Sequence, residues 1–207
     1  MTTHAIKLGV NKQAILDYAL CLLAASVLFS QTLISGALAD ERYGTFSGQP
    51  VVEFLPGGRN VKLREEITFT DSNNREWHVP SGVKTNGASI PRFLWVNYPP
   101  FTGKYRIAAV IHDHYCVTKD RKWQQVHRMF YDAMRAAGVK IATAKAMYAA
   151  VYLFGPRWAG RSQSIVLPNP LPDQEKIKIF KELEQWIKQK NPTPKEIRMR
   201  MRSRGLD

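Results

Sequence analysis

Hydrophobic and polar residues alternate with a short period in the first half of the chain and with a helical period in the second half. Alternating runs that favour strands lie at 51–54, 66–70 and 76–79, and turns rich in Gly, Pro, Asn and Asp separate them. Residues 62–80 indicate a hairpin, because a four-residue polar turn divides two segments rich in β-branched and aromatic residues. This part of the chain is therefore expected to form short antiparallel strands.

Three segments with helical periodicity follow, at 105–117, 123–137 and 142–154. In each, apolar residues recur three or four positions apart, which places them on one stripe of a helix. Gly138 and Gly155 stand where helices commonly end. Together with the strands, these helices predict an α+β fold with a three-helix core.

The remaining segments differ in character. Residues 80–103 contain many prolines and glycines and are expected to form an ordered loop. A Pro-rich linker at 167–173 precedes an amphipathic helix expected at 174–190. The last stretch, 197–204, alternates Arg with Met, Ile or Ser, and it is interpreted as a solvated basic tail.

The N-terminus has the three parts of a signal peptide: a mildly basic start, an apolar run from Tyr18 to Phe29, and the small residues Ala37-Leu38-Ala39. The predicted organisation is a signal peptide at 1–39, an α+β domain at 40–166, and a linker, helix and tail at 167–207. We expect an exported protein, periplasmic or secreted. The alternative is an uncleaved N-terminal anchor, which would place the domain on the same side of the membrane.

Composition agrees with a folded domain that has an anionic partner. Of the 207 residues, 44% are hydrophobic and 23% are charged, which suffices for a packed core. The net charge of +13 favours an anionic membrane surface or a cell-envelope polymer. Nucleic acid is not favoured, because the basic residues are spread along the chain and no aromatic stacking platform accompanies them. No partner protein can be identified.

The chain has two cysteines, Cys21 and Cys116, and Cys21 lies in the predicted signal peptide. An exported domain normally pairs its cysteines, so a single remaining thiol is expected to be buried and reduced on a helix. With one thiol left, a zinc site built from cysteines is excluded.

The string His112-Asp113 is the most informative for chemistry, since it sets an imidazole beside a carboxylate in a helix. Adjacent helical residues point about 100° apart, so the two side chains are expected to flank one cleft without pairing. Histidine can take a proton from water near neutral pH, and the carboxylate can hold a hard cation that polarises a carbonyl.

The helix that begins near Trp123 supplies the expected partner. His127 and Tyr131 lie along one edge of its apolar stripe, whereas Asp132 is expected to face solvent. The cluster of His112, Asp113 and His127 could bind a transition metal such as zinc, or the two histidines could hydrogen-bond through a water.

Residues 79–92 read VPSGVKTNGASIPR, and residues 108–115 read AAVIHDHY. These strings, with VHRMF at 126–130 and the residues MY and FG at 147–155, resemble a small domain of unknown function common in phage and bacterial genomes. That family carries VPxGFxTDGASIPR, AAxxHDxxY, ADxxFxxxM and MYxxVxxFG, and the resemblance covers about residues 50–158. It implies no activity by itself.

The HDxxY helix and the helix that follows it are also similar to the prokaryotic phospholipase A2 pattern. By this resemblance, His112 would be the base and Asp113 a calcium ligand, and His127 would stand where an orienting Asp is expected. Asn86 replaces the usual Asp of the loop, so two acidic positions are neutral here. The disulfides beside the His-Asp pair in the phospholipase are also missing.

Taken together, the sequence favours a phospholipase A2-like hydrolase that cleaves esters at a membrane surface. His112, Asp113 and His127 are the expected catalytic residues, and Asp113, Asn86 and His127 are the expected ligands for calcium or, alternatively, zinc. One rival is a non-catalytic envelope or phage-derived accessory domain in which the His-Asp pair stabilises the fold. A second rival is a zinc-dependent cell-wall hydrolase with His127 as a ligand.

Overall fold

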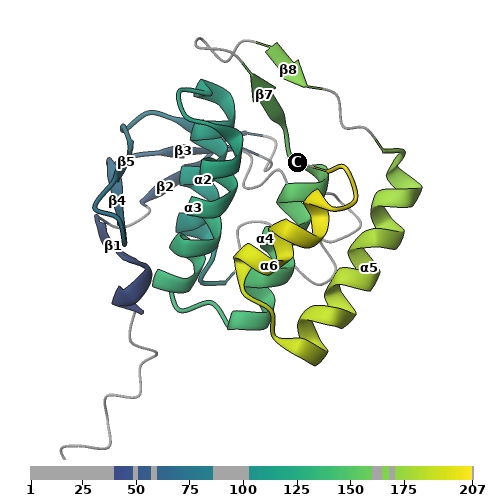
Figure 1. Ribbon diagram of the computed structural model, residues 1–207. Helices are drawn as coiled ribbons and strands as arrows, with labels where there is room; N and C mark the ends of the chain where they lie inside the picture. The colour runs from purple at the N-terminus through teal and green to yellow at the C-terminus, as the bar shows by residue number, and fades with distance from the viewer. Residues whose placement is uncertain are drawn as a thin grey trace, which may run out of the picture. The chain divides into compact units, whose positions relative to one another are not determined.

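Short strands come first along the chain and helices follow, as Figure 1 shows. The structure is a computed structural model, and it describes residues 40–48, 51–56, 60–85, 103–159, 165–167 and 171–206. These residues belong to one compact unit, Ala39–Asp207. The predicted signal peptide, Asn86 and most of the predicted loop at 80–103 lie outside the described residues.

The strands form two small antiparallel sheets and a separate strand pair. The first sheet has the order β1-β4-β5 and the second β2-β3-β6, whereas β7 pairs with β8. Their bounds are Gly44–Ser47 (β1), Val52–Phe54 (β2), Val61–Leu63 (β3), Ile67–Asp71 (β4), Glu76–Val79 (β5), Lys84–Thr85 (β6), Arg157–Ala159 (β7) and Ile165–Leu167 (β8). A short 3-10 helix, Glu41–Tyr43, precedes β1.

The hairpin of β4 and β5 follows directly from the alternating pattern. Ile67 and Phe69 are buried between half-buried threonines, and Trp77 and Val79 are buried on the facing strand. Ile67 pairs with Val79 and Phe69 with Trp77, so the apolar side chains of both strands share one face. The expected hairpin is confirmed, although β3 belongs to the other sheet.

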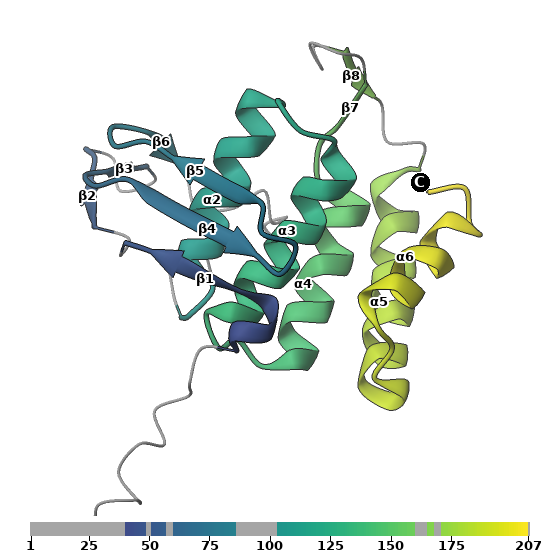
Figure 2. The same cartoon turned by 60° about the vertical axis from the view of Figure 1, so that its left-hand side comes forward.

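Three consecutive helices form the expected core. They are α2 (Arg106–Thr118), α3 (Trp123–Ala136) and α4 (Ile141–Phe154), each within two residues of its predicted bounds. The sheet of β1, β4 and β5 packs on α3, and α2 contacts β5 and β6 (Figure 2). The α+β fold with N-terminal antiparallel strands and a helical core is therefore confirmed.

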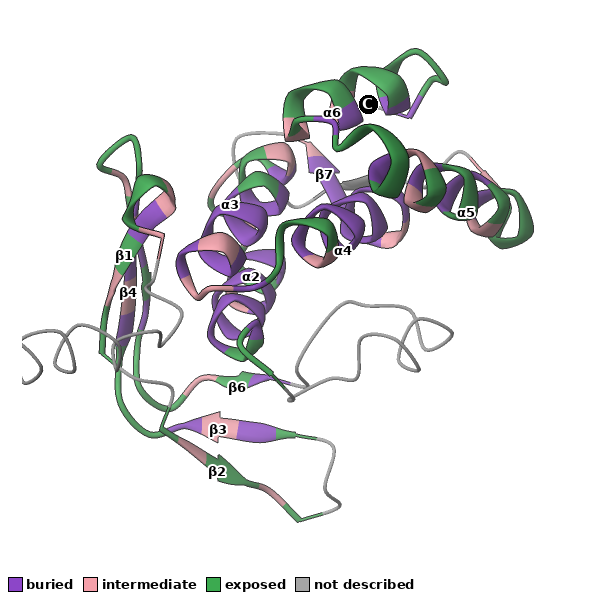
Figure 3. Cartoon of the chain, turned by 90° about the horizontal axis from the view of Figure 1, so that it is seen from below, coloured by how far each residue is buried: buried purple, intermediate pink, exposed green. Residues whose placement is uncertain are grey.

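Burial shows which of these helices is central (Figure 3). Every residue of α4 from Ala144 to Leu153 is buried, whereas α2 and α3 keep exposed positions on one side. Helix α4 contacts α3 on one side and the C-terminal helices on the other. A helix that is apolar all round is expected to be enclosed in this way.

Two helices close the chain, and one of them corrects a prediction. Helix α5 (Asp173–Lys190) agrees with the amphipathic helix expected at 174–190. The expected solvated tail at 197–204 is wrong for most of its length, because Pro194–Arg202 forms helix α6 and buries Ile197 and Met201. The alternation of Arg with Met hid a four-residue spacing that puts these two apolar residues on one helical face.

Both C-terminal helices pack against α4, and their buried residues join the same apolar core as α2 and α3. The proposed division of the chain at residue 167 stays a prediction. No helix among the residues that the structure describes combines the length and the apolar character needed to cross a membrane.

Candidate functional site

Two buried histidines from neighbouring helices meet at the centre of the candidate site. Helix α2 carries His112 and helix α3 carries His127, and these helices pack side by side. Nε2 of His112 lies 2.9 Å from Nδ1 of His127, so one ring donates a hydrogen bond and the other accepts it. The rings are 1% and 0% exposed. The direct contact replaces the water bridge that the sequence left open.

Aromatic side chains enclose the histidine pair, and this burial disfavours the charged form of each ring. The ring centroid of Phe130 lies 4.7 Å from that of His112, and the Trp123 ring meets His127 edge-on at 5.4 Å. Burial lowers the pKa of His112 to about 3. Burial also lowers the pKa of His127 well below its usual value, and the nearby His112 and the Arg157 charge lower it further. Both rings are therefore uncharged at neutral pH.

The outer nitrogen of His127 lies against the backbone that ends α4. Nε2 of His127 has no hydrogen-bond partner among the described residues. The nearby Pro156 carbonyl acts to raise the pKa of His127, but burial outweighs it. A Cβ at Gly155 would lie 3.0 Å from this nitrogen and would also clash with the Val151 carbonyl. Glycine is needed at position 155 because His127 and the helix end approach so closely.

Asp113 faces the second sheet. Thr85 of β6 donates a hydrogen bond of 2.6 Å from its hydroxyl to Oδ2 of Asp113, and the residue is 8% exposed. Oδ1 of Asp113 lies 4.0 Å from Nδ1 of His112, which is too long for a hydrogen bond. The two side chains form no hydrogen bond with each other, as expected. The expectation that both flank one cleft is wrong for His112, which is 1% exposed, whereas Asp113 reaches the wall of a hollow.

Cys116 lies one helical turn beyond His112 and joins the cluster. It is buried on α2, as expected, and its Sγ lies 3.6 Å from Nε2 and 3.8 Å from Nδ1 of His112. The expectation that cysteine takes part in no zinc site does not hold for Cys116, whose thiol is grouped with two histidines. The i, i+4 spacing of His112 and Cys116 was the signal that could have shown it, because such residues share a helix face.

Within the described residues, the side chains placed to hold a metal ion together are His112, Cys116 and His127, whose donor atoms lie within 4.8 Å of one another. The predicted ligand set was Asp113, Asn86 and His127. Asp113 is not part of the group found, and Asn86 lies outside the described residues.

A hollow of about 420 Å³ opens beside this cluster. Asp113 and Cys116 supply part of its wall from α2, and β6 supplies Lys84 and Thr85. The other lining residues are Asn60, Val117 and Pro156. The group of His112, Cys116 and His127 therefore meets this hollow through Cys116, with Asp113 beside it in the wall.

Asp132 corrects a further expectation. It was predicted to face solvent, but it is 5% exposed and accepts hydrogen bonds of 3.1 and 3.0 Å from Nε of Arg128. Burial raises the pKa of the Asp132 carboxyl, and Arg128 opposes that shift. Tyr131, expected beside His127 on the edge of the apolar stripe, is buried.

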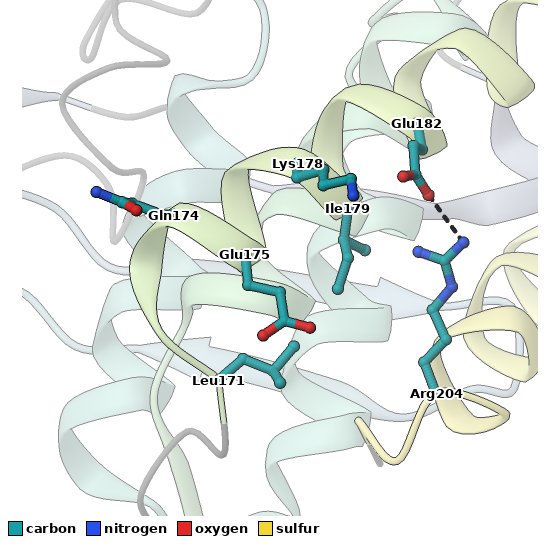
Figure 4. Close-up of a pocket in the computed structure, with 7 residues that line it drawn as sticks. All are labelled: Leu171, Gln174, Glu175, Lys178, Ile179, Glu182 and Arg204. Atoms are coloured by element: carbon teal, nitrogen blue, oxygen red, sulfur yellow. Dashed lines mark hydrogen bonds and ion pairs between the residues drawn. The ribbon is translucent and has the colours of Figure 1, made fainter.

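A larger hollow of about 590 Å³ lies between α5 and the turn after α6 (Figure 4). Its charged walls include Glu182 and Arg204, whose side chains form an ion pair at 2.9 Å. Glu175 and Lys178 also face it, and none of the residues predicted to act in catalysis lines it. The 420 Å³ hollow is therefore the better candidate for chemistry.

Part of the chain is similar to a known protein family. Residues 61–151 match the family described as "Protein of unknown function (DUF1353)". The expected resemblance to a small domain of unknown function is thus confirmed, whereas the resemblance to phospholipase A2 stays a prediction. No solved structure matches the chain at a significant level.

Two curated relatives come from Sinorhizobium fredii (strain NBRC 101917 / NGR234). The uncharacterized protein y4jT is 43% identical over 128 residues, which are 60% of this chain and 38% of that protein. The uncharacterized protein y4iH is 41% identical over 119 residues, which are 55% of this chain and 48% of that protein. The chain therefore spans less than half the length of either relative.

Proposed function

We propose that this domain is a hydrolase that cleaves ester bonds of lipids at an anionic membrane surface, with His112 as the base that activates water. The observation that carries the proposal is the hydrogen bond of 2.9 Å between His112 and His127. It fixes the orientation of the catalytic ring, which is the task of the orienting carboxylate in the phospholipase A2 pattern.

This hydrogen bond occupies Nε2 of His112 and leaves Nδ1 to meet a water molecule. Nδ1 lies 3.8 Å from Sγ of Cys116 and 4.0 Å from Oδ1 of Asp113. Both of these residues line the 420 Å³ hollow, so a water that enters the hollow would approach His112 past them. Burial makes this imidazole a weak base, so it can accept the proton of the attacking water only if the Asp113 carboxylate, 4.0 Å from Nδ1, stabilises the charged ring that forms.

Asp113 is the proposed cation ligand. Its carboxylate lies in the wall of the hollow, and Thr85 steadies it through Oδ2. A carboxylate favours a hard cation such as calcium, which would polarise the ester carbonyl and stabilise the oxyanion that forms. Asn86 follows Thr85 directly in the sequence and is the proposed second oxygen ligand.

Release of fatty acid from phosphatidylglycerol vesicles tests the proposal. The purified protein should release fatty acid with calcium and lose this activity in a calcium chelator. His112→Gln should lower the rate by about 10²- to 10⁴-fold, the usual contribution of a general base. His114→Gln, on the same helix, is the control and should keep the rate. Equal rates for wild type and His112→Gln would contradict the proposal.

A second candidate is the non-catalytic accessory domain, and the burial of both rings favours it. Two histidines that are almost fully enclosed and bonded to each other can serve to join α2 to α3. In that case the wild type releases no fatty acid, and His112→Gln lowers the melting temperature by several degrees relative to His114→Gln. Thermal unfolding of the same two variants therefore separates the two candidates.

A further inference from the structure

We infer that His112, Cys116 and His127 form a binding site for a thiophilic divalent transition metal, with zinc as the best match. The three side chains come from two adjacent helices, α2 and α3, and all are buried. This site and the calcium site proposed at Asp113 share no ligand, although Asp113 lies on the same helix, α2, as His112 and Cys116. It does not depend on the proposed hydrolase function.

The spacing of the donor atoms fits a tetrahedral metal. Zinc bonds of about 2.0–2.1 Å to nitrogen and about 2.3 Å to sulfur separate two nitrogens by about 3.3 Å and a nitrogen from a sulfur by about 3.6 Å. The observed separations are 2.9 Å between Nε2 of His112 and Nδ1 of His127, and 3.6 Å between that Nε2 and Sγ of Cys116. The two rings need to part by only about 0.4 Å.

The chemical state of the donors also suits a metal. Both rings are neutral, so coordination expels no proton from either. The ring that donates the hydrogen bond must move its proton to its outer nitrogen, which frees the inner lone pair for the metal. The Cys116 thiol must give up its proton to the solvent when the metal–sulfur bond forms. Each zinc ion bound should therefore release one proton at a pH at which the free thiol is protonated.

Groups outside the donor set can support the ligands. The Pro156 carbonyl lies near Nε2 of His127, which has no other described partner and would carry the proton once Nδ1 binds metal. Oδ1 of Asp113 lies 4.0 Å from Nδ1 of His112, and a small movement would let it accept a hydrogen bond from that nitrogen once Nε2 binds metal. Carbonyl and carboxylate groups commonly orient metal-binding histidines in this manner.

The hollow supplies the fourth coordination position. Cys116 is both a donor and part of the wall of the 420 Å³ hollow, so the metal would have one open side. Three protein ligands and one exchangeable ligand are typical of zinc that takes part in chemistry, whereas structural zinc is usually enclosed by four protein ligands. The donor set contains a sulfur and no carboxylate, so calcium and magnesium should not bind here.

Zinc at this site would compete with the proposed base. It would bind Nε2 of His112, shift the proton of that ring to Nδ1, and replace the hydrogen bond to His127. A metal-bound imidazole has its lone pair in the metal–nitrogen bond and still carries a proton on its other nitrogen at neutral pH, so it cannot act as a base. Metal binding is measured directly, so its failure is distinguishable from a failure of the hydrolase proposal.

Cobalt substitution of the full-length, untagged protein tests the site. Metal-free protein titrated with Co²⁺ should bind one ion and develop the visible bands of tetrahedral cobalt and a near-ultraviolet band from thiolate-to-cobalt charge transfer. Zinc should then displace the cobalt and erase both features. Wild-type protein that stays folded and shows no charge-transfer band with cobalt would overturn the inference, whatever the variants do.

Matched variants identify the ligands. Cys116→Ser should abolish the charge-transfer band, whereas Cys21→Ser, which changes the other cysteine of the chain, should keep it. His127→Gln should weaken zinc binding by at least about tenfold, within the range found when a ligand environment is disturbed. His114→Gln should bind zinc as the wild type does. A charge-transfer band that survives Cys116→Ser and disappears in Cys21→Ser would place the metal elsewhere.

Discussion

The carboxylate of Asp71 stabilises the β4–β5 hairpin by accepting hydrogen bonds from residues of the turn and of β5. Its Oδ1 accepts hydrogen bonds from the backbone N–H groups of Asn73 and Arg75, at 2.9 and 3.1 Å. Its Oδ2 accepts from the Arg75 guanidinium at 2.9 Å and from the Trp77 indole at 3.2 Å. Burial alone would raise the pKa of this carboxyl, but these donors outweigh it and the pKa is lowered.

This shift predicts how stability depends on pH. A carboxyl whose pKa is lower in the folded state stabilises the fold above its unfolded pKa, and that contribution is lost as the pH falls through the folded value. Asp71→Asn should therefore lower the free energy of unfolding by about 1–3 kcal/mol at pH 7. The difference from wild type should shrink below about pH 4, where the wild-type carboxyl becomes protonated in the unfolded state.

Urea unfolding at several pH values measures this effect. Glu65→Gln is the matched control, because Glu65 is exposed and the substitution also replaces a carboxylate with an amide. The control should differ from wild type by no more than about 0.5 kcal/mol at any of these pH values. A deficit of Asp71→Asn that stays constant down to pH 3 would show that shape, and not charge, accounts for the role of Asp71.

Helix α6 shows at the element scale how a highly basic segment can still be part of the core. Thr193 and Glu196 form a capping box, and Pro194 occupies the first turn, so the start of the helix is well defined. Ile197 and Met201 lie one turn apart and are fully buried, and α6 packs on α4. The arginines between them remain on the other faces of the helix.

The packing of α6 predicts a clear contrast between two apolar residues. Ile197→Ala should lower the free energy of unfolding by about 2–5 kcal/mol, because it removes buried methyl groups and leaves a cavity. Met199→Ala should change it by less than about 0.5 kcal/mol, because Met199 is 58% exposed. Chemical denaturation of the two variants measures this. Equal, small effects would mean that α6 does not stay docked in solution.

The charge of the whole chain sets its behaviour toward surfaces. Because the chain carries a net charge of +13, we expect it to bind vesicles rich in phosphatidylglycerol. The binding should weaken steeply between 0.1 M and 1 M salt, as the Debye length falls from about 10 Å to about 3 Å.

Co-sedimentation with anionic and with phosphatidylcholine vesicles tests this expectation. The apolar N-terminal segment is present with both, so a difference between them reports on charge. Equal binding to neutral and anionic vesicles, or binding that ignores salt, would remove the support for an anionic membrane partner.

Sequence periodicity predicted most of the fold because local patterns determine most of it. The hairpin strands carry a two-residue alternation and α2 to α5 carry a helical one, and each appears near its predicted bounds. The errors occur where two patterns overlap. Asp132 is charged and lies beside the apolar stripe of α3, and only its pairing with Arg128 makes its burial acceptable.

The candidate site was predictable in part. His112 and His127 were expected as partners from their positions on two helices, and the structure places them in contact. The contribution of Cys116 was missed although its spacing from His112 was visible, because a single cysteine was judged only by whether it could pair with another. The contact of Thr85 with Asp113 joins residues 28 positions apart, and no local pattern indicates it.

The sequence by itself determined the α+β class, the helical core, the excess of positive charge and the presence of a histidine beside an aspartate, because periodicity and composition depend only on neighbours along the chain. Only the tertiary structure decided that His127 meets His112, that Cys116 completes a three-donor cluster, and that α6 is docked. Those features depend on how helices cross and on which faces they bury, and packing between distant segments sets both.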